Sequence, residues 1–145
     1  MDPLTLPQIA AWAPDGDFEP RSFLQANSTI AEAVALTAVF WPAFVEYRGR
    51  VFLEMAFERA VVDDWFTQLG DGAAVEAVVN HLHVWDLFGV DGEAEEEAAV
   101  FLASTIAETW HAAASKRFPG TSFTVSMSNE AEDYGPTVTL TSITR

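Results

Sequence analysis

Two histidines and a carboxylate lie close together in the run from Asn80 to Asp86, a combination from which proteins build metal sites and general-base pairs. The apolar residues around this run recur at helical spacing. On a helix, His81 and His83 would point about 200° apart, because each residue turns about 100°. Only on a strand would the two rings share a face. A helix instead aligns Glu76, Asn80 and His83. The ligand-binding candidates are therefore Glu76, Asn80, His83, Asp86 and His111.

The motif content of the chain argues against an enzyme. The chain has no cysteine, which excludes thiol catalysis, disulfides, iron–sulfur clusters and cysteine-ligated zinc. It contains no G-x-S-x-G nucleophile turn, no H-E-x-x-H zinc motif and no glycine-rich phosphate loop. If His83 and Asp86 formed a general-base pair, catalysis would also need a nucleophile, which no motif supplies. We therefore assign no catalytic residue, no metal and no cofactor, and favour a protein that is not an enzyme.

Acidic residues dominate the charge, with 22 Asp and Glu against 7 Lys and Arg and a formal net charge of −15. This charge opposes nonspecific binding to nucleic acid and to an anionic membrane surface, since both require cations on the protein. The excess is localised, because residues 60–115 hold 11 of the acids and no Lys or Arg. The partner-binding candidates gather in one short run of this segment: Asp91, Glu93, Glu95, Glu96 and Glu97.

Helical periodicity predicts four helices, near 29–41, 58–69, 73–88 and 92–118. Thr29 and Glu32 have the spacing of a capping box at the start of the first. The last helix begins with several glutamates and ends with Lys116 and Arg117, before Pro119. Because the helix dipole favours anions at the first turn and cations at the last, this helix is the most strongly predicted element.

Two β-hairpins are expected, at about 43–55 and about 121–143. The first has Arg48-Gly49 between two β-rich runs, and the second alternates apolar residues with serine and threonine. The order of hairpin, helices and hairpin predicts an α+β fold. In this fold a small antiparallel sheet, built from the two hairpins, packs against three to four helices.

Residues 1–26 form a distinct segment, because four prolines in it forbid a long helix: Pro3, Pro7, Pro14 and Pro20. We expect an irregular N-terminal arm that packs on the domain through Trp12 and Phe18, whose rings are large enough to dock it. Residues 27–145 then make a single α+β domain.

The chain shows no sign of export or membrane insertion. Its start, Met1-Asp2-Pro3-Leu4, has neither the basic residues nor the apolar stretch of a signal peptide. No run approaches the roughly 18 apolar residues of a membrane-spanning helix. We expect a cytoplasmic protein. Its many alanines, and an excess of Arg over Lys, are typical of a GC-rich bacterial genome.

These observations favour a small acidic binding or inhibitor protein that docks a basic protein partner through its acidic helical face. Bacterial immunity proteins offer an analogy of class only, since no motif identifies such a family. One alternative is a small-molecule or metal-binding domain around Asn80, His83, Asp86 and His111. The other is a homo-oligomeric structural module, such as a homodimer.

Overall fold

The computed structural model describes residues 1–129 and 134–143, and it confirms the α+β fold. The strands form two small antiparallel sheets rather than one, the first of β1 and β2 and the second in the order β3-β5-β4. The α-helices are α1 (Pro7–Trp12), α2 (Pro20–Asn27), α3 (Ile30–Phe40), α4 (Arg59–Leu69), α5 (Gly72–Val79), α6 (Val84–Leu87) and α7 (Glu93–Arg117). The strands are β1 (Phe44–Tyr47), β2 (Arg50–Leu53), β3 (His81–His83), β4 (Ser122–Ser128) and β5 (Thr137–Ile143). Short 3-10 turns lie at Pro3–Thr5 and Glu54–Ala56.

The first hairpin turns where the sequence predicts. Tyr47 on β1 lies opposite Arg50 on β2, which leaves Arg48 and Gly49 as a two-residue turn. Both turn residues have positive φ angles, 49° and 73°. Positive φ at both positions matches the right-handed twist of the flanking strands, and glycine adopts it without steric cost. This hairpin therefore follows from local sequence.

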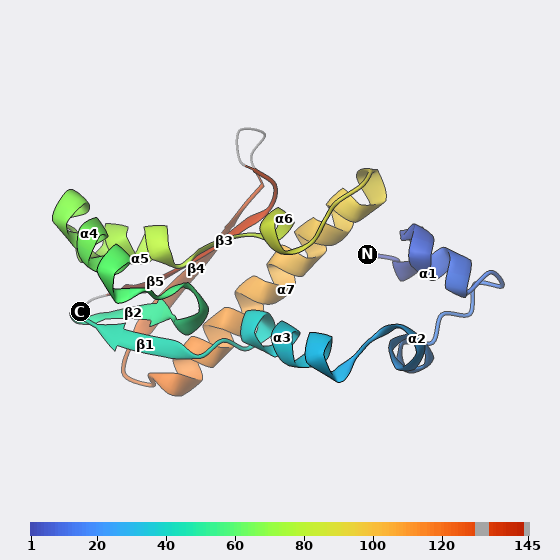
Figure 1. Ribbon diagram of the computed structural model, residues 1–145, viewed down its shortest axis with the longest axis horizontal. Helices are drawn as coiled ribbons and strands as arrows, with labels where there is room; N and C mark the ends of the chain where they lie inside the picture. Colours follow the sequence, from blue (N-terminus) through green and yellow to red (C-terminus); the bar gives the residue numbers. More distant parts are fainter. Residues whose placement is uncertain (130–133, 144–145) are drawn as a thin grey trace.

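Helix α7 and the three-stranded sheet enclose the main core (Figure 1). The buried face of α7 packs across β4 and β5. Small alanines alternate with larger side chains on this face, which lets the helix lie close to the strands. Its fully or nearly buried members are Ala99, Ala103, Ile106, Trp110, Ala113 and Ala114. The strands meet them with Phe123, Val138 and Leu140, and present serine and threonine on their other face.

The helix expected over 73–88 is interrupted, and this is the main departure from the sequence prediction. Helix α5 ends at Val79, and residues 81–83 pair with Thr137–Thr139 as strand β3. The Asn80 carbonyl accepts from the Leu140 amide at 3.2 Å, and the Val84 amide donates to the Pro136 carbonyl at 2.9 Å. Because this backbone pairs with β5 instead of with itself, His81 and His83 share one face of a strand.

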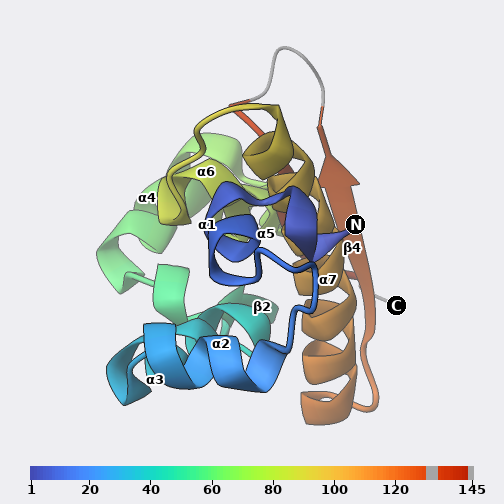
Figure 2. The same cartoon turned by 90° about the vertical axis from the view of Figure 1, so that its right-hand side faces the viewer.

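The N-terminal segment contains short helices that contact one another. The ring of Phe23 packs edge-on against Trp12, at 6.0 Å between centroids, and against Phe18, at 5.7 Å. Each of α1 and α2 starts with a proline, which is favourable at the first turn of a helix and unfavourable further in. Helix α7 lies between the three-stranded sheet and α1 in two perpendicular views (Figures 1 and 2). The division into an arm (1–26) and a domain (27–145) stays a prediction.

Helix α3 presents apolar side chains to solvent. Ile30 is 85% exposed and Val34 is 63% exposed. No single helix in residues 1–129 and 134–143 has the length and apolar character to cross a membrane. Helices α2 and α3 meet that criterion only as a pair, and the chain bends by 118° between them. Ile30 and Val34 are therefore in contact with water rather than with the core.

The capping box predicted for α3 is confirmed. The Thr29 hydroxyl oxygen accepts from the Glu32 amide at 3.2 Å, and the Glu32 carboxylate accepts from the Thr29 amide at 2.7 Å. The carboxylate also accepts from the Thr29 hydroxyl at 2.8 Å. These hydrogen bonds hold the pKa of Glu32 below its ordinary value of 4.5, and the bond from the Thr29 hydroxyl has the largest effect.

Helix α3 should therefore unwind at its start on acidification. A lowered carboxyl pKa stabilises the helix above the ordinary value, and this contribution is lost as the pH falls through the lowered value. Thr29→Ala, which removes the cap, should cost about 1 kcal/mol of helix stability already at pH 7. Chemical shifts of residues 30–40 between pH 7 and pH 3 measure both effects. Ser28→Ala is the control, because Ser28 is exposed and outside the capping box. If the chemical shifts of residues 30–40 change neither with pH nor in Thr29→Ala, the prediction is wrong.

Candidate functional site

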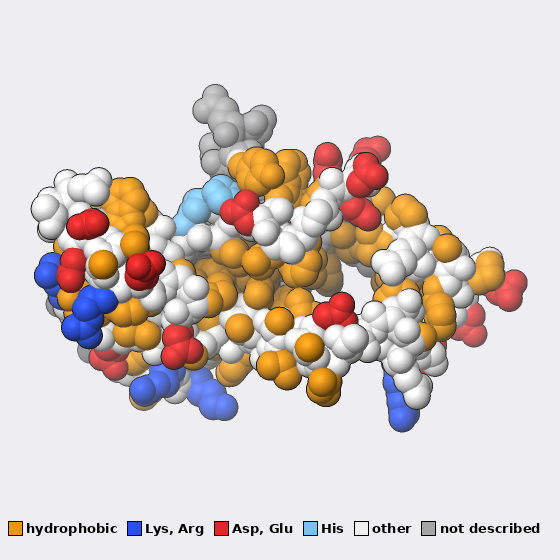
Figure 3. All heavy atoms as spheres, viewed as in Figure 1, with side chains coloured by type: hydrophobic (Ala, Val, Ile, Leu, Met, Phe, Trp, Pro, Cys, Tyr) orange, Lys and Arg blue, Asp and Glu red, His pale blue; other side chains and the backbone are white. Residues whose placement is uncertain are grey.

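The acidic face, defined as Asp91, Glu93, Glu95, Glu96 and Glu97, lies at the start of α7. Its side chains reach solvent, and only Glu95 is partly buried. Figure 3 shows acidic side chains gathered over the beginning of this helix, while most Lys and Arg side chains lie toward the other end of the molecule. The residues that the sequence nominated for partner binding therefore form one exposed patch.

Arg48 and Arg59 have partners near the first hairpin. Arg48 pairs with Asp63 at 2.9 Å, and Arg59 lies 5.1 Å from the ring centre of Tyr47. Lys116 and Arg117 occupy the last turn of α7, about 30–36 Å from its first turn at 1.5 Å per residue. That distance exceeds the Debye length of about 8 Å at physiological salt, so these cations do little to offset the charge of the acidic face.

Part of the acidic face also has a local structural role. A Glu95 carboxylate oxygen accepts from the Asp91 amide at 2.6 Å, which fixes the loop before α7. Gly92 at the N-cap has no side chain with which to cap the helix. Acidic groups in the first turn compensate for this through the helix dipole. Glu95 is therefore a structural residue, whereas Glu93, Glu96 and Glu97 are exposed without such a contact in the described part of the chain.

Glu76 and Asn80 are buried and join the two sheets. The Glu76 carboxylate accepts from the Val51 amide at 2.7 Å and from the Ser142 amide at 2.9 Å. It also accepts from the Ser142 hydroxyl at 2.6 Å and lies 3.4 Å from Arg50. Since the carboxylate already bonds to strands β2 and β5, it has the partners of a structural group.

His83 lies on β3 rather than on the helical face of Glu76 and Asn80. It faces His81, with 2.9 Å between the two Nε2 atoms. Each Nδ1 meets a threonine of β5: His83 at 2.9 Å from Thr137 Oγ1, and His81 at 3.2 Å from Thr139 Oγ1. His81 is thus a site residue that the helical prediction set aside, although its i, i+2 spacing contained the signal.

Asp86 and His111 stand apart from this pair. Asp86 is exposed on α6, while His111 is exposed on α7 beside Glu108 and Val125, in a shallow depression between α7 and β4. Within residues 1–129 and 134–143, no group of three or more His, Cys, Asp or Glu side chains is placed to hold a metal ion. The five ligand-binding candidates are therefore spread over α5, β3, α6 and α7.

No protein-family model, curated protein or solved structure matches this chain. The functional argument therefore depends on the chain's own residues.

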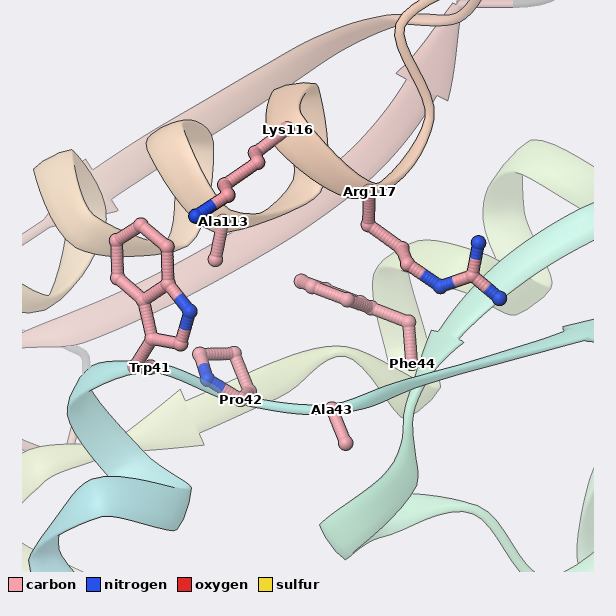
Figure 4. Close-up of a pocket in the computed structure, with 7 residues that line it drawn as sticks. All are labelled: Trp41, Pro42, Ala43, Phe44, Ala113, Lys116 and Arg117. Atoms are coloured by element: carbon pink, nitrogen blue, oxygen red, sulfur yellow. The ribbon is translucent and has the colours of Figure 1, made fainter.

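A cleft that no sequence pattern predicts lies where the ends of α3 and α7 meet. Its volume is about 360 Å³, and it is lined by Trp41, Pro42, Ala43, Phe44, Ala113, Lys116 and Arg117. The Lys116 amine turns toward Trp41, 5.8 Å from the ring centre, whereas Arg117 points away from it (Figure 4). The Trp41 ring thus holds Lys116, while the Arg117 guanidinium lies 5.1 Å from the ring centre of Phe118. Sequence patterns could not relate residues so far apart in the chain.

Proposed function

We propose that this protein is a small acidic cytoplasmic protein that docks a basic protein partner through the acidic face. The observation that carries the proposal is the cluster of five acidic residues at the start of α7, four of them exposed, with Lys116 and Arg117 about 30–36 Å away. A concentrated negative field of this kind attracts a cationic surface and orients it before contact.

The proposed association has two steps. The acidic face accelerates encounter with the basic partner, because long-range attraction raises the association rate. Close contact then requires apolar surface, since charged rims alone add little affinity once water is displaced. Exposed apolar side chains of the N-terminal helices are available for this step, among them Trp12, Leu24, Ile30 and Val34. Binding would occlude a cationic cleft on the partner, as an inhibitor does.

Neutralising the acidic face tests the proposal. Immobilised wild-type protein should retain a basic protein from the native lysate at low salt and release it as salt increases. For that protein, once isolated, the triple variant Glu93→Gln, Glu96→Gln, Glu97→Gln should associate about ten-fold more slowly. Glu95 is left in place because it holds the loop before α7.

A matched variant separates the acidic face from total charge. Glu46→Gln, Glu54→Gln, Glu58→Gln removes the same number of charges from exposed positions near the first hairpin. Wild-type association rates in this control support a local docking face. Equal losses in the two triple variants, or retention that ignores ionic strength, would contradict the proposal.

Self-association is a second candidate. It is favoured by the exposed apolar side chains of α3, where Ile30 is 85% exposed and Val34 is 63% exposed. Salt distinguishes the two functions. Copies that each have a net charge of −15 repel one another, so salt should strengthen a homodimer but weaken a complex with a basic partner. Light scattering over a range of salt concentrations measures the sign of this effect.

A further inference from the structure

We propose that His81 and His83 form a two-histidine binding site for a divalent transition metal that prefers tetragonal coordination, with Cu²⁺ the best fit. The site is separate from the acidic face and does not depend on the function proposed above. The proposal is based on the geometry of the histidine pair on β3 and on the contacts of Thr137 and Thr139 of β5 with the Nδ1 atoms. Imidazole nitrogens are preferred ligands of such metals.

One arrangement of neutral tautomers satisfies the hydrogen bonds around the pair. In this arrangement the Thr137 hydroxyl donates to the Gly135 carbonyl at 3.2 Å, and its oxygen accepts from His83 Nδ1–H at 2.9 Å. Neutral His83 then has a bare Nε2, which accepts from His81 Nε2–H at 2.9 Å. His81 Nδ1 in turn accepts from the Thr139 hydroxyl at 3.2 Å. In this arrangement His83 has the tautomer that a metal ligand needs.

Metal binding requires one rearrangement of protons and no net release. His81 must move its proton from Nε2 to Nδ1, and the Thr139 hydroxyl must turn from donor to acceptor. Both Nε2 atoms then offer lone pairs on the same side of β3, and each Nδ1–H is held by a threonine oxygen. A hydrogen bond behind the ring fixes its tautomer and orientation and strengthens the ligand, as second partners do in known metal sites.

The separation of the two nitrogens, set by their hydrogen bond, also suits a particular metal geometry. With metal–nitrogen bonds of about 2.0–2.1 Å, two ligands at 90° lie about 2.9 Å apart, whereas a tetrahedral angle separates them by about 3.3–3.4 Å. The observed distance of 2.9 Å fits two adjacent positions of a tetragonal ion without widening. Among divalent first-row metals, Cu²⁺ also binds nitrogen ligands most strongly. Water supplies the remaining ligands.

The surroundings suit a cation at this place. His81 is exposed and His83 is half-buried. Tyr134 packs its ring against His83, at 6.0 Å between centroids, and against Trp85, at 5.5 Å. These contacts limit rotation of the His83 ring. The net charge of −15 raises the local concentration of divalent cations around the whole chain.

Copper titration of the untagged full chain tests the site. We expect one Cu²⁺ ion by calorimetry, and an electron paramagnetic resonance spectrum with hyperfine coupling to two imidazole nitrogens. His81→Gln and His83→Gln should each weaken Cu²⁺ binding more than ten-fold. Thr137→Val, which leaves both rings in place, should weaken it about ten-fold through the lost second partner. Mg²⁺ should not bind, since it prefers oxygen ligands.

His111→Gln is the matched control, because it removes the third histidine of the chain from α7 while leaving β3 unchanged. It should retain wild-type affinity and spectrum. His81→Gln changes an exposed side chain, so its melting temperature without metal should stay near that of the wild type. Unchanged Cu²⁺ affinity in His81→Gln, or a spectrum without coupling to two imidazoles in the wild type, would overturn the proposal.

Discussion

Replacing Asn80 by alanine should lower the free energy of unfolding by about 3–5 kcal/mol, because three buried backbone groups lose their partner. The Asn80 side chain is completely buried. Its Oδ1 accepts from the Leu53 amide at 2.8 Å, and its Nδ2 donates to the carbonyls of Val51 at 2.8 Å and Leu140 at 3.1 Å. The Asn80 side chain thus bonds to backbone groups of both β2 and β5, which do not pair with each other.

Denaturant unfolding of three variants isolates this effect. Gln68→Ala is the control, since Gln68 is an exposed amide on α4 and should change stability by less than about 0.5 kcal/mol. Asn80→Asp keeps the acceptor for Leu53 and loses the donor to two carbonyls, so it should also be strongly destabilised. If Asn80→Ala unfolds as the control does, the amide does not join the sheets.

The same hydrogen-bond network accounts for the polar residues Glu76 and Asn80, which the sequence predicts as ligand-binding candidates. Their i, i+4 spacing places Glu76 on α5 and Asn80 at its C-cap, whereas His83, predicted on the same helical face, lies on β3. A pattern of polar residues on a helix cannot show whether that face meets solvent, a ligand or buried backbone. Here it meets the inner edges of β2 and β5, because neither sheet continues into the other.

Elements with strong local signals were predicted well. The Arg48-Gly49 turn, the Thr29–Glu32 box and the span of α7 all match the structure. In each case the deciding interaction lies within a few residues: a positive φ, a reciprocal hydrogen bond, or charges at the two ends of one helix. The α+β class follows from the sum of such local signals.

Strand β3 could not be predicted in this way, since its pairing partner lies more than fifty residues further along the chain. The helical periodicity of α5 continues into residues 82 and 85, so the pattern gives no sign of a break. Tertiary pairing with β5 outweighs that preference. The same pairing brings His81 and His83 together. A prediction that continues the helix through residues 81–83 therefore misses the histidine pair.

Replacing Trp110 by alanine should cost about 3–5 kcal/mol, because its indole is fully buried in the core and its removal leaves a large cavity. The indole has a second role at the N-terminal side of the molecule. Its Nε1–H donates to the Val39 carbonyl at 2.7 Å. Val39 lies in the last turn of α3, where carbonyls have no donor within the helix, so Trp110 caps α3 from α7.

Trp110→Phe separates the two roles. Phenylalanine keeps most of the apolar volume and removes the donor, so we expect a loss of about 1–3 kcal/mol. Amide exchange should also accelerate at the end of α3, ahead of the strands of the core. Trp12→Phe is the control, since the Trp12 ring is partly exposed in the N-terminal segment. If exchange in Trp110→Phe rises equally in α3 and in β5, the indole serves only as core, and the end of α3 is held by its other contacts with α7.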